Sequence, residues 1–326
     1  MAVSLARAAQ GATRETMTPG PGRAQGGRDE HVITQVDRLG GDIAAPDVLD
    51  LAEQVARVDG VEALSEQSVL ELRTPVRPVR HFLALDGDGG LVGYAQLDHG
   101  QGAAQAGAEL AVVPAARRRG VGRALLDAVR GAAPGVSVWA HGNLPGAQAL
   151  AKAAGMSVVR ELLQMSAPLG PVDATVPRHP GVVVETFVAG RDEQDWVTLN
   201  ARAFAEHPEQ GRMTVADLRA REAEDWFDPT LLWLVRPAAD PDGPPVASMW
   251  VKVVPGERSG EIYALGVDPG AQGQGLGGML TRRALAELHR RGLSRATLYV
   301  EGDNAAALRT YQREGFHCVA IDVQYR

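Results

Sequence analysis

Apolar and polar positions alternate along the chain with two periods, which together predict helices and strands in a definite order. Apolar residues recur at helical spacing over 48–58, whereas 82–85 and 91–97 have the spacing and composition of two strands. Residues 86–90 between these strands are rich in turn-forming types, so a hairpin is expected there. A third strand, at 110–113, then leads into a glycine-rich turn and an amphipathic helix. A fourth strand follows at 136–140 and a last helix at 146–154.

The same order of predicted elements recurs in the second half of the chain, at residues 192–205, 231–235, 246–254, 262–267, 296–300 and 304–314. Gly120 and Gly275 are 155 positions apart. That offset also relates Leu110 to Leu265, Val112 to Val267, Pro114 to Pro269 and Gly122 to Gly277. An offset of 160 then relates Trp139 to Tyr299 and Gly155 to Gly315, so the second half carries a five-residue insertion. Because one offset persists through strand, turn and helix, we interpret the halves as a duplicated domain.

The composition of the connecting segments predicts where the domains begin and end. Residues 1–30 are rich in Ala, Gly and Arg without periodicity, so we expect a disordered tail. Residues 168–180 contain four prolines and are the predicted linker. The first domain is therefore expected over 31–167 and the second over 181–326.

Charge and composition exclude several classes of function. The chain has 40 acidic and 33 basic residues and no basic stripe, so nucleic acid is not an expected partner. No apolar run approaches the roughly 18 residues of a membrane span, and no apolar signal core opens the chain. The single cysteine, Cys318, excludes an intramolecular disulfide. His141 and His207 have no second ligand at metal spacing. We expect a cytoplasmic monomer without a metal or a membrane anchor.

The glycine-rich turns at residues 117–123 and 272–278 each follow a strand ending in Val and Pro and each open a helix. The free N–H groups at a helix N-terminus bind anions, and glycine lets the backbone approach a pyrophosphate closely. A lone Gly-x-Gly is typical of a simple tight turn, but dinucleotide-binding and Gly-Lys-Ser/Thr phosphate-loop patterns do not match these segments. Both segments fit Arg/Gln-x-x-Gly-x-Gly/Ala, which is the pyrophosphate signature of the GNAT acetyltransferases.

Longer segments resemble the mycothiol synthase family, whose members are tandem GNAT acetyltransferases. The similar segments are 203–210, which contains His207-Pro208-Glu209-Gln210, and 226–229, 261–269, 298–304, 309–312, 315–316, 58–61, 65–67 and 139–142. The resemblance implies two α/β GNAT domains, each with a mixed, mostly antiparallel sheet flanked by helices. It also implies transfer of the acetyl group of acetyl-CoA to the cysteinyl amine of cysteinyl-glucosaminyl-inositol, the last step of mycothiol synthesis.

The resemblance also implies roles for individual residues, most of them in the second half. Acetylation of an ammonium needs a base, stabilisation of the thioester oxygen and an acid for the leaving thiolate. Glu261, at the start of the strand before the phosphate turn, is the expected base, directly or through water, and Tyr311 is the expected acid. The expected contacts of the acceptor are Glu66, Glu209, Lys252, Glu261 and Tyr299.

In the second half, acetyl-CoA is expected to contact the end of one strand, the phosphate turn and the start of the last helix. In the first half, the expected contacts are the end of the strand and the turn. In the second half these residues are Leu265, Gly266, Val267, Gln272, Gly273, Gln274, Gly275, Leu276, Gly277, Gly278, Asn304, Ala305, Ala306, Ala307, Leu308 and Arg309. In the first half they are Leu110, Ala111, Val112, Arg118, Arg119, Gly120, Val121, Gly122 and Arg123.

The two offsets show which proposed catalytic groups the first half has lost. Position 261 corresponds to Ala106, position 311 to Ala151 and position 304 to Leu144, so apolar residues replace all three polar candidates. We therefore expect the first domain to bind acetyl-CoA without turnover. Two alternatives remain open: a tandem acetyltransferase for another amine, and an acyl-CoA-binding sensor that does not catalyse a reaction.

Overall fold

The computed structural model describes residues 31–41, 43–75, 78–99, 106–170, 179–205 and 210–326. The first half contains β1 (Val32–Val36), α1 (Ala45–Asp59), α2 (Glu66–Arg73), β2 (Val79–Leu85), β3 (Leu91–Asp98), β4 (Gly107–Val112), α3 (Val121–Ala132), β5 (Ser137–Ala140), α4 (Pro145–Ala153) and β6 (Val158–Pro168). The second contains β7 (Val182–Thr186), α5 (Glu193–Ala203), α6 (Val215–Glu222), β8 (Leu232–Pro237), β9 (Ala247–Lys252), β10 (Ser259–Val267), α7 (Leu276–Arg290), β11 (Arg295–Glu301), α8 (Ala305–Arg313) and β12 (His317–Tyr325). Short 3₁₀ helices lie at Pro114–Ala116, His141–Asn143, Gln210–Arg212, Pro229–Leu231 and Pro269–Ala271.

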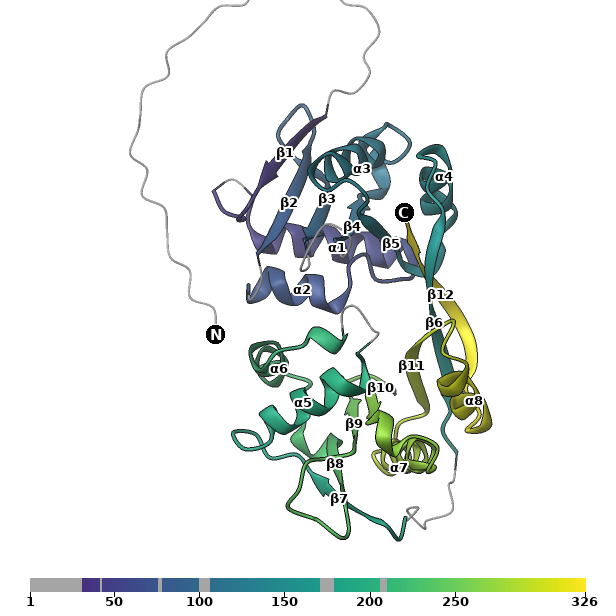
Figure 1. Cartoon of the computed structure of the whole chain (residues 1–326). Coiled ribbons are helices and arrows are strands. Elements are labelled where there is room, and N and C mark those ends of the chain that lie inside the picture. Colours follow the sequence, from purple (N-terminus) through teal and green to yellow (C-terminus); the bar gives the residue numbers. More distant parts are fainter. Residues whose placement is uncertain (1–30, 42, 76–77, 100–105, 171–178, 206–209) are drawn as a thin grey trace, which may run out of the picture.

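The element order confirms the duplication, because the ten elements from β1 to β6 recur as β7 to β12 with the helices in the same places (Figure 1). The apolar pattern had not indicated α2 and α6, since each is a short helix with few buried apolar residues. Both begin at an N-cap: the Ser65 hydroxyl accepts a hydrogen bond from Ser68 N, and Thr214 forms a capping box with Asp217.

The two halves share one sheet in the order β1-β2-β3-β4-β5-β12-β6-β11-β10-β9-β8-β7. The last strand of each half therefore pairs with the other half: β6 is antiparallel to β11, and β12 is antiparallel to β5. The exchanged strands β6 and β12 are also antiparallel to each other, and both run between the halves in Figure 1. Ser157 and Arg326 close this ladder with two reciprocal backbone hydrogen bonds of 2.8 and 2.9 Å. The mixed, mostly antiparallel strands with flanking helices match the expected fold, whereas the exchange was not predicted.

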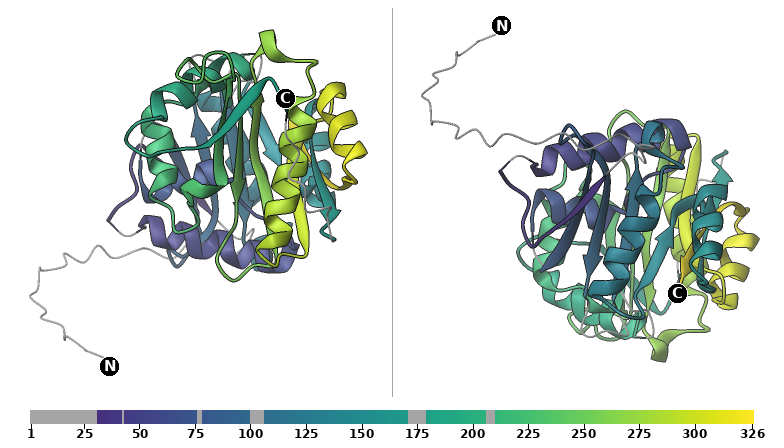
Figure 2. Two further views of the ribbon diagram at one scale, coloured as in Figure 1. Left: turned by 90° about the horizontal axis from the view of Figure 1, so that it is seen from below. Right: turned by 90° about the horizontal axis from the view of Figure 1, so that it is seen from above.

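Helices cover both faces of the sheet (Figure 2). On one face, α7 packs its apolar residues onto Ile262 and Leu298, and α3 packs in the same way on the first half. On the other face, α1 and α2 cover the first half, and α5 and α6 cover the second. The core under α5 and α6 is aromatic, with Trp196 in an edge contact to Trp250 at 5.4 Å between ring centroids. Alternation along each strand thus separates two cores in each half.

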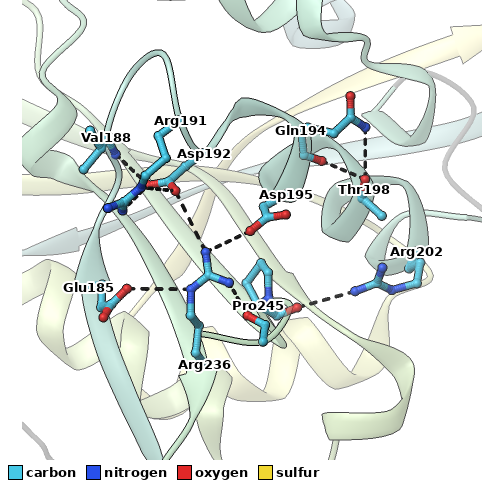
Figure 3. A network of polar contacts seen from close by, with 11 residues as sticks. Glu185, Val188, Arg191, Asp192, Gln194, Asp195, Thr198, Arg202, Arg236 and Pro245 are labelled. Carbon is cyan, nitrogen blue, oxygen red and sulfur yellow. Dashed lines mark hydrogen bonds and ion pairs between the residues drawn. The ribbon is translucent and has the colours of Figure 1, made fainter. Parts of the chain in front are cut away.

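A buried arginine fixes α5 against the outer strands of the second half. The side chain of Arg236 on β8 is 7% exposed and pairs with Asp195 at 2.9 Å, Glu185 at 3.6 Å and Asp192 at 3.9 Å (Figure 3). Asp192 also accepts a hydrogen bond from Val188 N at 2.8 Å. A buried guanidinium is stable only when its charge is compensated in this way. The network sets the direction of α5, which leads to Phe204 beside β10.

Two of the predicted segments cannot be compared with the structure. The expected tail, 1–30, lies outside the described residues, and so does most of the expected linker, at 171–178. Within the described part of the chain, none of the helices combines the length and apolar character needed to cross a bilayer.

Replacing Val323 with alanine is expected to lower the free energy of unfolding by about 2 kcal/mol in both halves, because Val323 is 2% exposed and pairs with both β5 and β6. Val319 on the same strand is 53% exposed, so Val319→Ala should change it by less than about 0.5 kcal/mol. Urea unfolding is followed by tryptophan fluorescence. In the Trp139→Phe background the signal comes from the second half alone, because the other tryptophans lie there, and comparison with the protein that keeps Trp139 gives the signal of the first half. Destabilisation of only one half would contradict the role of the exchange.

Candidate functional site

The strands β10 and β11 separate at the centre of the second half. Their parallel pairing joins Ser259–Ile262 to Arg295–Leu298, although β10 continues to Val267 and β11 to Glu301. A β-bulge at Tyr263 marks the start of the separation, because Ile262 pairs with Val251 and the next pair is Ala264 with Trp250. Every second N–H of β10 beyond the bulge is directed away from β9 and toward the space between the separating strands.

The predicted phosphate turn lies at the N-terminus of α7, beside this separation. Gly273 and Gly275 have φ of +77° and +81°, the left-handed region in which glycine is favoured. No atom lies within 4 Å of a Cβ placed on either residue, so the backbone N–H groups are open to a bulky anion. The Gln272 amide donates to Val267 O at 3.4 Å and holds the turn against the strand. Its backbone geometry fits a pyrophosphate.

The corresponding turn of the first half has the same shape with different side chains. Gly120 has φ of +93°, and Arg118, a non-glycine residue, has φ of +64° at the position of Gly273. Arg117 replaces Gln272: its Nε donates to Val112 O at 3.0 Å, and its two terminal nitrogens donate to the Asp59 carboxylate at 2.7 Å each. This arginine therefore holds the turn to the end of α1.

The first half also has separating strands and an open cleft. The parallel pairing of β4 and β5 is limited to Gly107–Ala108 with Ser137–Val138. A cavity of about 710 Å³ opens beyond it. The lining includes Leu110, Val112, Arg118, Gly120, Gly122 and Arg123, together with Leu144 and Ala151. Ala111 lines it as well, and the Arg123 side chain bonds Asp127 and Ala153 O rather than the turn.

Glu261 lies on β10 just before the bulge, opposite Lys252 on β9. Burial raises the pKa of Glu261 to about 7, with the charge of Lys252 acting in the opposite direction and the charges of Glu66 and Glu257 adding to the rise. A carboxyl that titrates near neutral pH at a strand separation is suited to accept a proton.

Lys252 connects the two halves at this carboxyl. Its ammonium group forms an ion pair with Glu66 at the start of α2 and lies over the ring of Trp226, 4.6 Å from the centroid. Its side chain is 16% exposed and that of Glu66 is 29% exposed. The tertiary structure thus brings Glu66 and Lys252, expected as acceptor contacts, into one partly buried cluster with Glu261.

Three further polar residues of this junction were not singled out from the sequence. Arg221 on α6 donates from Nε to Tyr263 Oη at 2.6 Å and from a terminal nitrogen to Gln67 Oε1 at 2.7 Å. It therefore joins the bulge in the second half to α2 in the first. Gln67 and Tyr263 lie in segments that resemble the family, which is the one signal that marks them before the structure is known.

Glu261 and Tyr311 approach the strand separation from opposite faces of the sheet. Ile262 and Tyr311 belong to the core under α7, and the ring of Tyr311 packs against Phe316 at 5.7 Å between centroids. Glu261, adjacent to Ile262, is directed to the face that carries α5 and α6. Burial raises the pKa of Tyr311, which keeps its hydroxyl protonated.

The other expected site residues fall at the ends of neighbouring elements. Asn304 is the N-cap of α8, since its side chain accepts from Ala307 N at 3.0 Å, and residues 305–309 form the first turns of that helix. Tyr299 on β11 is 46% exposed, on the same face as Glu261. Glu209 lies outside the described residues. Within the described ranges, no three His, Cys, Asp or Glu side chains are grouped as metal ligands.

The bulge at Tyr263 corrects one expected equivalence between the halves. Glu261 pairs with Lys252 and Thr297, and the first-half residue that pairs in the same way, with Asp98 and Ser137, is Gly107. The equivalent position is therefore Gly107 and not Ala106, because the bulge adds one residue to β10 that a fixed offset does not detect. In either register, the first half has no carboxylate at this point.

Family models match both halves of the chain. The acetyltransferase (GNAT) family model matches residues 195–316, and an acetyltransferase (GNAT) domain model matches residues 78–155. The mycothiol acetyltransferase of Beutenbergia cavernae is 47% identical over 298 residues, which covers 89% of this chain and 97% of that protein. The mycothiol acetyltransferase of Thermomonospora curvata is 49% identical over 302 residues, covering 91% and 98%.

Solved structures share the tandem arrangement. A GCN5-related N-acetyltransferase from Sphaerobacter thermophilus superposes with a TM-score of 0.64 at 22% identity, over 90% of this chain and 94% of that one. A tandem GNAT protein from the clavulanic acid biosynthesis pathway gives 0.65 at 20% identity, over 91% and 98%. At this identity the likeness shows the fold alone.

Arg118→Gly is expected to raise the free energy of unfolding by about 1 kcal/mol, because it relieves a left-handed conformation that is unfavourable for a residue with a Cβ. The mirror substitution, Gly273→Ala, should lower it by a similar amount at the equivalent position of the other turn. Chemical denaturation of both variants measures the two changes. If both substitutions changed the free energy of unfolding in the same direction, backbone strain at this position would not be the cause.

Proposed function

The chain belongs to the mycothiol acetyltransferase family and is an N-acetyltransferase, and from this premise we propose that its second half acetylates the cysteinyl amine of cysteinyl-glucosaminyl-inositol. The acetyl donor is acetyl-CoA, and the product is mycothiol. The observation that carries the proposal is Glu261, a carboxyl with a pKa raised to about 7 where β10 and β11 separate. The first half has glycine at that position.

In the proposed reaction, Glu261 removes a proton from the acceptor ammonium, directly or through a water molecule. The free amine then attacks the thioester carbonyl carbon and a C–N bond forms. The nitrogen loses its second proton to water as the C–S bond breaks, and water returns a proton to the acid that protonates the departing thiolate. Since the pKa of Glu261 lies near 7, about half of the carboxyl groups are ionised at neutral pH, and the ionised form is basic enough to take the proton. Charged Lys252 nearby stabilises this ionised form.

Tyr311 is the proposed donor of a proton to the departing thiolate. Burial raises its pKa, so the hydroxyl carries its proton before the reaction. Tyr311 lies on the sheet face opposite to that of Glu261, so the base and the acid flank a thioester placed between the separating strands. This arrangement keeps the two proton transfers apart.

The fit of acetyl-CoA rests on backbone groups of the second half. The N–H groups at the start of α7 hold the pyrophosphate in the proposal, with residues 272–278 forming the turn. The N–H groups of β10 at residues 265–267 that face the separation stabilise the oxygen of the thioester carbonyl. The first turns of α8, at residues 304–309, line the other side.

The acceptor is proposed to bind between the halves, beside Glu66, Lys252 and Tyr299. Carboxylates from both halves, Glu66 and Glu261, favour an ammonium group there. Glu209 is assigned to the same site by resemblance alone. The first half is proposed to bind acetyl-CoA without turnover, because its cleft is lined by Ala151 where the second half has Tyr311.

Thiol release from acetyl-CoA, measured with and without cysteinyl-glucosaminyl-inositol, tests the proposed reaction. We expect release that depends on this acceptor and a kcat reduced about 10²- to 10⁴-fold by Glu261→Gln, since a general base contributes that much. Tyr311→Phe should also lower kcat, with little change in the KM of the acceptor. Absence of acceptor-dependent release, or turnover of other amines alone, would overturn the assignment of the substrate.

The rate should rise with pH through about 7, because Glu261 must lose its proton before it acts as a base. Glu66→Gln removes a charge that raises this pKa, so the acidic limb of kcat/KM should move to lower pH. Lys252→Met removes a charge that lowers it and should move the limb to higher pH. Glu53→Gln, an equal charge change at an exposed position on α1, is the control. Shifts in the same direction for both variants would refute Glu261 as the titrating base.

A further inference from the structure

The exchanged strands carry a continuous row of polar side chains beside the proposed base. Tyr299 on β11 pairs with Gln164 on β6, so both side chains lie on the face that carries Glu261. Gln164 Nε2 donates to Asp322 Oδ1 on β12 at 3.1 Å. On the opposite face the same strands present apolar residues, such as Leu298 and Met165, to the core under α7.

The row continues into the first half through a charged histidine. His141 Nδ1 lies 3.4 Å from Asp322 Oδ2, and His141 Nε2 lies 3.6 Å from Glu109 Oε2. Burial opposes the charge on His141, but its hydrogen bonds to Asp322 and Glu109 and their charges outweigh it and raise the pKa of His141 to about 10. Asp322 also accepts a hydrogen bond from Gly142 N at 2.6 Å. These contacts hold the carboxylate in one orientation.

A second row of polar side chains crosses the same strands, displaced from the first along the strand direction. Arg160 on β6 donates from Nε to both carboxylate oxygens of Glu301 on β11, at 3.0 Å each. Its guanidinium lies over the ring of Trp139 on β5, 5.0 Å from the centroid. Since Trp139 and Arg160 both pair with Gln324, they share the face of Asp322, two residues away on the same strand.

Among the described residues, the helical cores of this face lie to either side of the central strands. The cores of α1 and α2 involve strands of the first half up to β4, and those of α5 and α6 involve strands of the second from β8 to β10. We call the residues between them the central polar face: Trp139, His141, Arg160, Gln164, Tyr299, Glu301 and Asp322. Gln164 and Trp139 are partly exposed there, and Tyr299 is exposed.

We propose that the central polar face binds the hydroxyl-rich sugar and inositol rings of the acceptor, with Gln164 as a specificity-determining residue. The inference rests on the proposed function, which places the acceptor amine at Glu261 and Tyr299. Neighbouring strands lie roughly 4.8 Å apart, so the face extends about 14 Å from β10 to β12, where only the rings of the acceptor reach. Fixed donors and acceptors are what a neutral polyol needs, because each unpaired hydroxyl would weaken binding.

The geometry assigns each row a part in this recognition. The Gln164 amide carries a donor and an acceptor next to Tyr299, and it is oriented by the bond to Asp322. Asp322 is buried and its oxygens are bonded to Gly142, Gln164 and His141, so its part is to orient the Gln164 amide. Arg160 holds Glu301 and the ring of Trp139 in the same way at the end of the face. Since β6 belongs to the first half and β12 to the second, the strand exchange builds this subsite from both.

Steady-state kinetics of Gln164→Leu test the proposal with two acceptors, cysteinyl-glucosaminyl-inositol and a cysteine amide that lacks both rings. We expect the KM of the full acceptor to rise about tenfold, the loss of one or two hydrogen bonds, with the KM of acetyl-CoA unchanged. The ring-free acceptor should react equally with both proteins. Glu161→Gln, at the exposed neighbouring position on the opposite face of β6, is the control and should leave all values unchanged.

The outcomes separate this inference from the proposed function. Wild-type protein that fails to acetylate the full acceptor overturns the proposed function itself. Wild-type turnover with an unchanged acceptor KM in Gln164→Leu, or an equal loss on the ring-free acceptor, overturns the subsite. If the leucine variant unfolds, Gln164→Asn, which keeps the amide, replaces it in the experiment. This variant should give a smaller rise in the KM of the acceptor. An unchanged KM would also refute the assignment.

Discussion

The pairing of β12 between β5 and β6 is the interaction on which the rest of the structure depends. Each half lends its last strand to the other, so backbone hydrogen bonds, and not side chains alone, set the relative position of the halves. A sheet ladder tolerates little sliding, since a one-residue slip would reverse the face of every side chain. For this reason Glu66 of the first half reaches Lys252 of the second with a defined geometry.

The electrostatic character of the site follows from that fixed junction. Burial raises the pKa of Glu261 toward neutral pH. The charge of Lys252 lowers this pKa, and the charge of Glu66 raises it from across the interface. A domain that has lost its own proposed base therefore still influences the base of its neighbour. The bridge from Arg221 to Gln67 and Tyr263 adds two hydrogen bonds from a charged guanidinium to the same contact. The charge environment of Glu261 thus depends on both copies of the duplicated domain.

The duplicated halves show which parts of the fold are general and which are specialised. Both keep separating strands and a helix N-terminus preceded by left-handed backbone, the features that suit a pyrophosphate and a pantetheine arm. Only the second has the bulge at Tyr263 with an ionisable group before it. The first retains a cavity of about 710 Å³ beside the equivalent turn. In the proposed function, the first half keeps this scaffold without the proton-transfer groups and forms one wall of the acceptor site.

The choice of Glu261 and Tyr311 came from the resemblance to a family. The residue pattern by itself determined the duplication, the order of most elements and both phosphate turns, because periodicity and glycine spacing act over short stretches of chain. It had no means of showing the strand exchange, since β6 and β12 have the same alternation whichever half they pair with. The bulge that makes Gly107 the equivalent of Glu261 was hidden for a similar reason. The ion pair of Lys252 with Glu66 and the neutral-range pKa of Glu261 arise from residues far apart in the chain, so only the tertiary structure, which sets burial and distance, decided them.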